Sequence, residues 1–183
     1  MKILVVCTGN ICRSPMGEVL LKRALTDAGY PDVEVASSGT WGLTGSPATD
    51  EAVDVMREQG VDLTVHAACS LQTSDIEDAD LILAMTSVHL REIEALAPGT
   101  SRKVFLIKEL LELDLPELPV TASTENRLEV MCGAPRPQWR RALDLDDPMG
   151  RPRFAYERAA EQIAEGIEHL MRAVFPHRQQ DGG

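Results

Sequence analysis

The chain has 183 residues, a length that suits one domain with a complete hydrophobic core. Its 18 basic and 29 acidic residues give a formal net charge of −11 at pH 7, which argues against nucleic acids and anionic membranes as partners. Its four cysteines are too few for a disulfide scaffold, and no Cys and His pair has zinc-finger spacing. No apolar stretch reaches membrane-spanning length. We therefore expect a cytoplasmic protein with no metal, no cofactor and no membrane contact.

Predicted strands and helices alternate along the chain. The first strand is the apolar run over residues 3–6, and a helix over about 14–28 follows it after a short turn. The later strands are predicted at 33–36, 80–84 and 103–106, and the later helices at 47–59, 87–96 and 152–175. This alternation is typical of a three-layer α/β fold, in which a parallel sheet is covered by helices on both faces.

The segment 112–143 is the least regular part of the sequence. It contains four prolines and one short predicted helix, from 124 to 131. An extended surface loop with a functional edge and an insertion without a function are both open interpretations. We expect one domain over 1–176 that includes this irregular segment, followed by a disordered tail over 177–183.

The turn between the first strand and its helix is the candidate site. It reads Cys7-Thr8-Gly9-Asn10-Ile11-Cys12-Arg13-Ser14. Because the turn must be sharp, its successive backbone N–H groups can converge at the start of the helix and form an anion site. The same dipoles would stabilise a thiolate at Cys7, and Arg13 could hold two phosphate oxygens with one planar fork. The pattern predicts a phosphate-binding cup with a nucleophilic cysteine at its base.

The stretch over residues 6–16 resembles the signature of the low-molecular-weight protein tyrosine phosphatases nearly residue for residue. The resemblance implies a four-stranded parallel sheet in the order 2-1-3-4, with the cup at the carboxyl end of the first strand. It implies hydrolysis of phosphotyrosine monoesters through a phosphocysteine intermediate, with inorganic phosphate as the product. Cys7 and Arg13 are then catalytic, and the phosphate-binding residues are Thr8, Gly9, Asn10, Ile11, Cys12, Arg13 and Ser14.

This chemistry also needs a proton donor for the departing oxygen. The resemblance places that residue in an Asp-Pro pair late in the chain, and the sequence offers Asp144-Leu145-Asp146-Asp147-Pro148. The proline restricts Asp147 to an extended backbone, which helps to aim its carboxyl group. We predict that Asp147 is the general acid and later the general base. Taken alone, the residues also fit a loop end that caps the final helix.

The resemblance implies a supporting hydrogen-bond network of Asn10, Ser14, Ser37 and His66. Asn10 is expected in the left-handed backbone conformation, which asparagine tolerates better than most residues. Ser14 could donate a hydrogen bond to the Cys7 sulfur, could cap the helix that follows, or could do both.

Substrate selection is expected at the rim of the cup. Trp41 lies among three glycines, which is typical of a surface loop, and it is predicted to form a wall for an aromatic phosphoester. Met149 stands where the family commonly has an aromatic residue after the Asp-Pro pair, with Phe154 and Tyr156 as candidates to replace that ring. Cys12 could form a reversible disulfide with Cys7, or could be a small buried residue.

Three other interpretations remain open. An arsenate reductase with this cup relays a disulfide through further thiols, but the stretch 80–90 contains no cysteine, so an external thiol would have to act instead. Protein-arginine phosphatases carry Thr at the position of Ile11, whose bulk should crowd a guanidinium group. The third interpretation is a non-catalytic phosphate-binding module, and the joint presence of Cys7, Arg13 and Asp147 argues against it.

Overall fold

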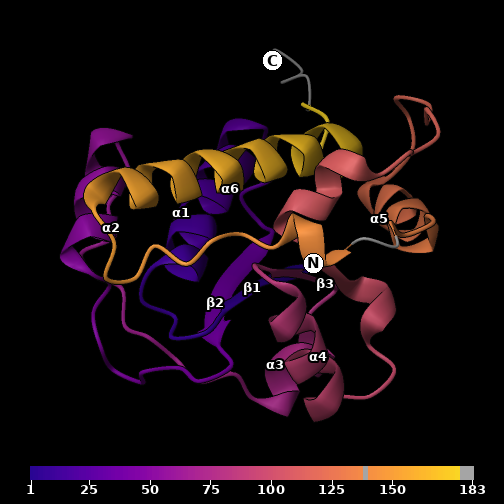
Figure 1. Ribbon diagram of the computed structural model, residues 1–183. Coiled ribbons are helices and arrows are strands. Elements are labelled where there is room, and N and C mark those ends of the chain that lie inside the picture. The colour runs from indigo at the N-terminus through magenta and orange to yellow at the C-terminus, as the bar shows by residue number, and fades with distance from the viewer. Residues whose placement is uncertain (138–139, 178–183) are drawn as a thin grey trace.

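The computed structural model describes residues 1–137 and 140–177, and its centre is a four-stranded parallel sheet with helices on both faces (Figure 1). The strand order is β2-β1-β3-β4, so the expected fold is confirmed. The strands are β1 (Lys2–Cys7), β2 (Glu34–Gly39), β3 (Leu81–Ala84) and β4 (Val104–Leu106). The tail predicted from residue 177 onward lies outside the described residues, except for His177 itself.

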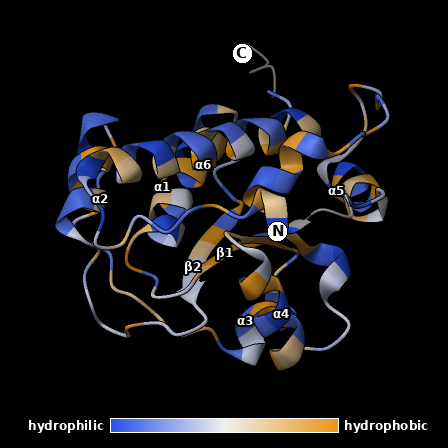
Figure 2. Ribbon diagram, viewed as in Figure 1, coloured by the Kyte–Doolittle hydropathy of each residue, from blue (hydrophilic) through white to orange (hydrophobic). Residues whose placement is uncertain are grey.

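The helices are divided between two hydrophobic clusters, one on each face of the sheet. The larger cluster packs against α1 (Arg13–Asp27), α2 (Asp50–Glu58), α5 (Thr124–Gly133) and α6 (Arg153–Val174). The smaller cluster is covered by α3 (Thr73–Asp78) and α4 (Ser87–Leu96). Figure 2 shows the apolar residues along β1 and the inner side of α6, with polar residues on the outer side of that helix.

The side chains of β1 alternate between the two clusters. Ile3, Val5 and Cys7 belong to the larger cluster, whereas Leu4 and Val6 belong to the smaller one. Because both faces of this central strand are covered, its apolar run is uninterrupted. Cys7 is the last residue of β1, so the candidate nucleophile lies at the carboxyl edge of the sheet, where open α/β sheets bind their ligands.

Two glycines allow helices to approach the layer beneath them. A Cβ at Gly17 of α1 would lie 3.0 Å from Val5 Cγ1 of β1. A Cβ at Gly166 of α6 would lie 2.5 Å from the carbonyl oxygen of Ile107, the first residue of the 3-10 helix η2 (Ile107–Glu112). A side chain at Gly166 would therefore push α6 off η2, whereas one at Gly17 would require Val5 to shift by a few tenths of an ångström.

Helix boundaries differ from the prediction where a polar residue sets the start. The helix predicted from residue 47 begins at Asp50, because the Thr49 side chain accepts a hydrogen bond from the Ala52 N–H and caps it. Helix α3 and the 3-10 helices η1 (Ser101–Lys103), η2 and η3 (Arg140–Leu143) were not predicted, since each is too short to show a hydrophobic period. Within the described residues, no helix is both long and apolar enough to cross a membrane.

Candidate active site

The turn between β1 and α1 is shaped by Asn10. It is the one non-glycine residue with a positive φ, 56°, in the described parts of the chain. Its Nδ2 donates to Ser14 Oγ at 2.9 Å and to Ser37 Oγ at 2.8 Å, and its Oδ1 accepts from the Cys69 N–H at 2.8 Å. His66 Nε2 lies 2.7 Å from the Asn10 carbonyl oxygen. The structure thus brings together the four residues of the expected network.

Cys7 lies at the base of this turn, with 2% of its surface exposed, and its Sγ is 2.9 Å from Ser14 Oγ. Asn10 donates to the same oxygen, so the Ser14 hydroxyl hydrogen can be given to the sulfur or to the Ser38 carbonyl oxygen, which is 3.5 Å from Ser14 Oγ. A donor at this distance stabilises a thiolate. Ser14 does not cap the helix, because α1 begins one residue earlier, at Arg13.

The network extends to Glu18 of α1, a partner that the sequence did not reveal. Ser37 Oγ donates to Glu18 Oε2 at 2.6 Å, which ties β2 to the helix that begins at the cup. The two residues are 19 positions apart, so no local pattern relates them. The backbone of Cys69, which holds the Asn10 side chain, was missed for the same reason.

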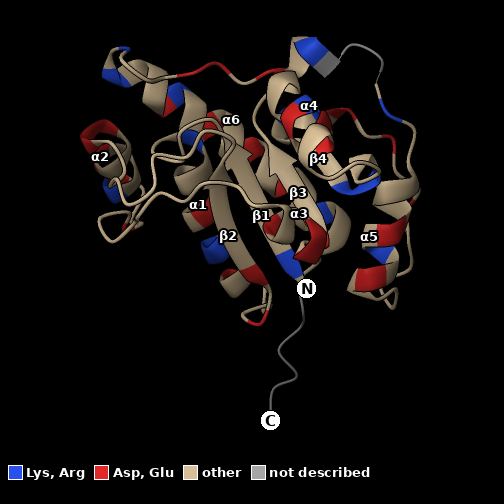
Figure 3. Ribbon diagram, turned by 90° about the horizontal axis from the view of Figure 1, so that it is seen from below, with Lys and Arg blue, Asp and Glu red and all other residues tan. Residues whose placement is uncertain are grey.

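Arg13 is the cationic group of the turn and is 4% exposed. Its Nη1 donates to the Leu145 carbonyl oxygen at 3.2 Å, and its Nη2 lies 2.7 Å from Asp147 Oδ2. Its buried Nε has no hydrogen-bond partner among the described residues, which favours an anion such as phosphate at this position. Figure 3 shows acidic residues spread over α2, α3, α4 and α5, so the attraction of phosphate is local to the cup.

Asp147 approaches the cup from a loop 134 residues further along the chain. Its side chain is 49% exposed, and its Oδ1 accepts a hydrogen bond from the Met149 N–H at 3.1 Å. One carboxylate oxygen therefore contacts Arg13 and the other is held by the loop itself. A half-exposed carboxyl group beside the cup is able to exchange a proton with a substrate and with water.

The loop that carries Asp147 is anchored on the connection between β3 and α4. The Leu145 N–H donates to the Met85 carbonyl oxygen at 2.8 Å. The Asp144 carboxylate accepts from the backbone N–H of Ser87 and, at 3.0 Å, from the Ser87 hydroxyl. Asp144 therefore holds the start of α4, while Asp146 is exposed.

The residues expected at the rim differ in their exposure to solvent. Trp41 is 74% exposed and its Nε1 donates to Glu92 Oε1 at 3.1 Å. Met149 and Phe154 are 54% and 66% exposed. Tyr156 is only 1% exposed, so the hypothesis that it replaces the missing rim aromatic is wrong. It lies on the inner face of α6, in the larger hydrophobic cluster.

The family model described as low molecular weight phosphotyrosine protein phosphatase matches residues 2–131. The chain belongs to this family. It is 44% identical over 166 residues to the "Probable low molecular weight protein-tyrosine-phosphatase EpsP" of Ralstonia solanacearum, covering 91% of this chain and 90% of that one. It is 31% identical over 169 residues to a protein-arginine-phosphatase of Geobacillus stearothermophilus, covering 92% and 93%.

Solved structures of the family share the fold. The low molecular weight protein tyrosine phosphatase from T. tengcongensis aligns with a TM-score of 0.74 and 33% identity, over 94% of this chain and 98% of that one. Vibrio vulnificus Wzb in complex with benzylphosphonate aligns with a TM-score of 0.70 and 29% identity, over 93% and 97%. The family model ends at residue 131, so the assignment of Asp147 depends on geometry.

Cys12 is the second thiol of the cup and is 4% exposed. Its Sγ lies 3.5 Å from Thr49 Oγ1 and 3.9 Å from Met149 Sδ. Burial is the main reason why the pKa of the Cys12 thiol is raised. Cys12 is therefore a protonated thiol at neutral pH, and it connects the cup to the loop that carries Asp147.

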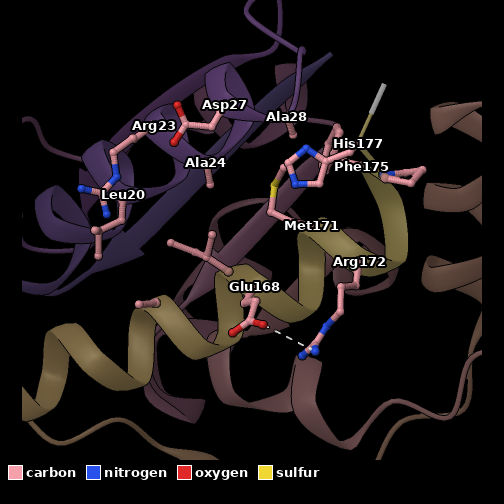
Figure 4. Close-up of a pocket in the computed structure, with 13 residues that line it drawn as sticks. Leu20, Arg23, Ala24, Asp27, Ala28, Glu168, Met171, Arg172, Phe175 and His177 are labelled. Atoms are coloured by element: carbon pink, nitrogen blue, oxygen red, sulfur yellow. Dashed lines mark ion pairs between the residues drawn. The ribbon is translucent and has the colours of Figure 1, made fainter. Parts of the chain in front are cut away.

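A pocket of about 680 Å³ lies outside this site. It lies between the C-terminal halves of α1 and α6, and Leu20, Met171 and Phe175 contribute to its mainly apolar lining (Figure 4). Both helices begin near the cup and run away from it, so the pocket is at their far ends. No residue of the cup lines it.

Proposed function

We propose that this chain hydrolyses phosphotyrosine monoesters of proteins, with Cys7 as the nucleophile, Arg13 as the phosphate ligand and Asp147 as the general acid and base. The observation that carries the proposal is the position of Arg13. One guanidinium group reaches Asp147 at 2.7 Å while its Nε stays unpartnered among the described residues. This contact supports treating the cup and the loop over residues 144–149, called the acid loop below, as one site.

In the first step, the Cys7 thiolate attacks phosphorus, an S–P bond forms and the bond to the phenolic oxygen breaks. Asp147 gives its proton to that oxygen, so the leaving group departs as neutral tyrosine. Arg13 and the backbone N–H groups of the turn stabilise the charge on the phosphoryl oxygens. In the second step, Asp147 takes a proton from water, the water oxygen forms a bond to phosphorus, the S–P bond breaks and phosphate is released. The Ser14 hydroxyl stabilises the departing thiolate.

The burial of Cys7 supports an aromatic substrate. Cys7 is buried while Trp41 and Met149 are exposed, which is compatible with an entrance that a long aromatic phosphoester crosses to reach the sulfur and for which phosphoserine is too short. Met149 packs less selectively than a ring would, because a thioether is flexible. All four cysteines are free thiols, which supports the proposed cytoplasmic location.

The test is a comparison of substrates. Turnover of a phosphotyrosine peptide, phosphoarginine and arsenate should be measured side by side, with Cys7→Ser as the blank. We expect the phosphotyrosine peptide to be hydrolysed fastest, because the buried Ile11 in the turn crowds a guanidinium group. Faster release of phosphate from phosphoarginine, the substrate of a relative with 31% identity, would overturn the assignment.

A further inference from the structure

A buried histidine contacts the cup from α4. His89 is 2% exposed, and its Nε2 lies 3.0 Å from Thr8 Oγ1. Its Nδ1 accepts a hydrogen bond from the backbone N–H of Thr86 at 3.1 Å. A backbone N–H can only donate, so Nδ1 carries no proton and the neutral ring carries it on Nε2. The Nε2–H group therefore donates to the Thr8 hydroxyl oxygen.

His89 stays neutral, with its proton on Nε2, at physiological pH. Burial and the nearby charge of Arg13 lower the pKa of His89 to about 4, against the opposing effects of Glu92, Asp147 and Asp144. A second proton would have to enter at Nδ1 and would break the contact with the backbone N–H of Thr86. Above about pH 5, His89 is neutral and presents one donor to the cup.

The Thr8 hydroxyl oxygen consequently accepts hydrogen bonds from His89 and Arg13, and its own hydrogen is left for another acceptor. Its oxygen faces two donors, His89 Nε2 at 3.0 Å and Arg13 Nη2 at 3.5 Å. A hydroxyl has two lone pairs and one hydrogen, so the hydrogen must point elsewhere. His89 and Arg13 are buried, whereas Thr8 is exposed and directly follows Cys7. The O–H hydrogen is therefore left for a third acceptor, and the exposed position of Thr8 beside Cys7 leaves room for one.

We propose that the Thr8 hydroxyl donates to a phosphoryl oxygen of the bound substrate, and that His89 is the positioning residue that fixes its direction. The proposal rests on the phosphatase function argued above. It adds one side-chain donor to the backbone N–H groups of the turn. A donor that is oriented before binding needs no reorganisation when the phosphoryl group arrives.

The first test is the binding of inorganic phosphate, measured by calorimetry at pH 7. Thr8→Val removes the hydroxyl but keeps the shape, and it should weaken binding about tenfold, as expected for one lost hydrogen bond to a charged group. Thr8→Ser, the matched control, should bind like the wild type. An unchanged Kd for Thr8→Val would overturn the proposal. Calorimetry needs no turnover, so a failure of the proposed catalytic function would be seen separately.

The second test is a double-mutant cycle with His89. His89→Leu should weaken phosphate binding in the wild type and have no further effect in Thr8→Val, because His89 acts through Thr8. His89→Gln keeps an amide donor and should recover part of the loss. Additive losses would overturn the positioning role. Thermal unfolding of each variant identifies misfolded chains, and if His89→Leu does not fold, His89→Gln and the Thr8 variants decide.

Discussion

The cup and the acid loop are in contact through Arg13 and Asp147 but are held in place differently. The cup is eight contiguous residues between a central strand and a helix, and its one left-handed residue, Asn10, is fixed by four hydrogen-bond partners. The acid loop directly follows the irregular segment 112–143. It is anchored by Asp144 on α4 and by the Leu145 backbone, which bonds to Met85 and accepts from Arg13.

The difference shows which part of the site is held in a fixed geometry by its contacts. The cup, which must surround a phosphoryl group closely, is rigid because its own sequence and its network determine it. In the proposed mechanism the acid loop has only to bring one carboxyl group to the leaving oxygen, and its half-exposed Asp147 is held by two contacts, with Arg13 and with the Met149 N–H. Substitutions of the catalytic residues in the cup should therefore abolish activity, whereas substitutions at the anchor of the acid loop should only reduce it.

The largest effect is expected in the cup. Cys7→Ser should reduce phosphotyrosine hydrolysis to background while phosphate binding is kept, because a hydroxyl is a far poorer nucleophile at neutral pH. Steady-state turnover and phosphate calorimetry measure the two properties. Cys132→Ser changes a half-buried thiol outside the cup and is the matched control. Substantial turnover by Cys7→Ser would refute the phosphocysteine mechanism.

The next largest effect is expected at Asp147, the proposed general acid. Asp147→Asn should hydrolyse phosphotyrosine roughly 10²–10⁴-fold more slowly, the usual contribution of general acid–base catalysis. The loss should shrink for a nitrophenyl ester, whose leaving group needs less protonation. Rates for a series of leaving groups of graded acidity check this. If the dependence on the leaving group matched that of the wild type, the proton donor would have to be another residue.

The comparison also explains how much the sequence could predict. The cup, the central strand and the conformation of Asn10 were predictable, because a short stretch of the chain carries all their signals. The contacts of Asp144 with Ser87 and of His89 with Thr8 join residues that are 57 and 81 positions apart, and no local pattern encodes them.

Tyr156 is the opposite case, because the local hydrophobic period of its helix does indicate its position. The helical period over 152–175 already placed Tyr156 on the apolar face with Ile163 and Ile167. The structure buries all three. A position shortly after Asp147 in the sequence does not determine the side of a helix that a residue occupies.

A smaller effect is expected at the anchor of the acid loop. Asp144→Ala removes the acceptor for the backbone N–H and hydroxyl of Ser87, and it should lower the free energy of unfolding by about 1 kcal/mol, as for a lost helix cap. The rate of phosphotyrosine hydrolysis should fall less than in Asp147→Asn, because Asp144→Ala leaves the Asp147 carboxyl group in place. Denaturant unfolding and turnover are the measurements, with the exposed Asp146→Ala as control. A larger rate loss at Asp146 would contradict the geometry.

The smallest effect on turnover is expected at Cys12, which contacts both regions. Cys12→Ser should keep its activity under reducing conditions, because no catalytic step uses this thiol. Peroxide oxidises Cys7 to a sulfenic acid, and the Cys12 thiol can condense with it to form a disulfide and release water. Activity of the wild type should therefore return on addition of thiol, and activity of Cys12→Ser should return less completely.

The pH dependence of this protection sharpens the last prediction. The thiolate is the attacking form, and burial raises the pKa of Cys12, so protection of the wild type should improve as pH rises above neutrality. The measurement is the fraction of activity recovered after a fixed peroxide treatment at several pH values. Equal recovery of the wild type and Cys12→Ser across that range would show that Cys12 is only a small buried residue that packs the cup against Met149.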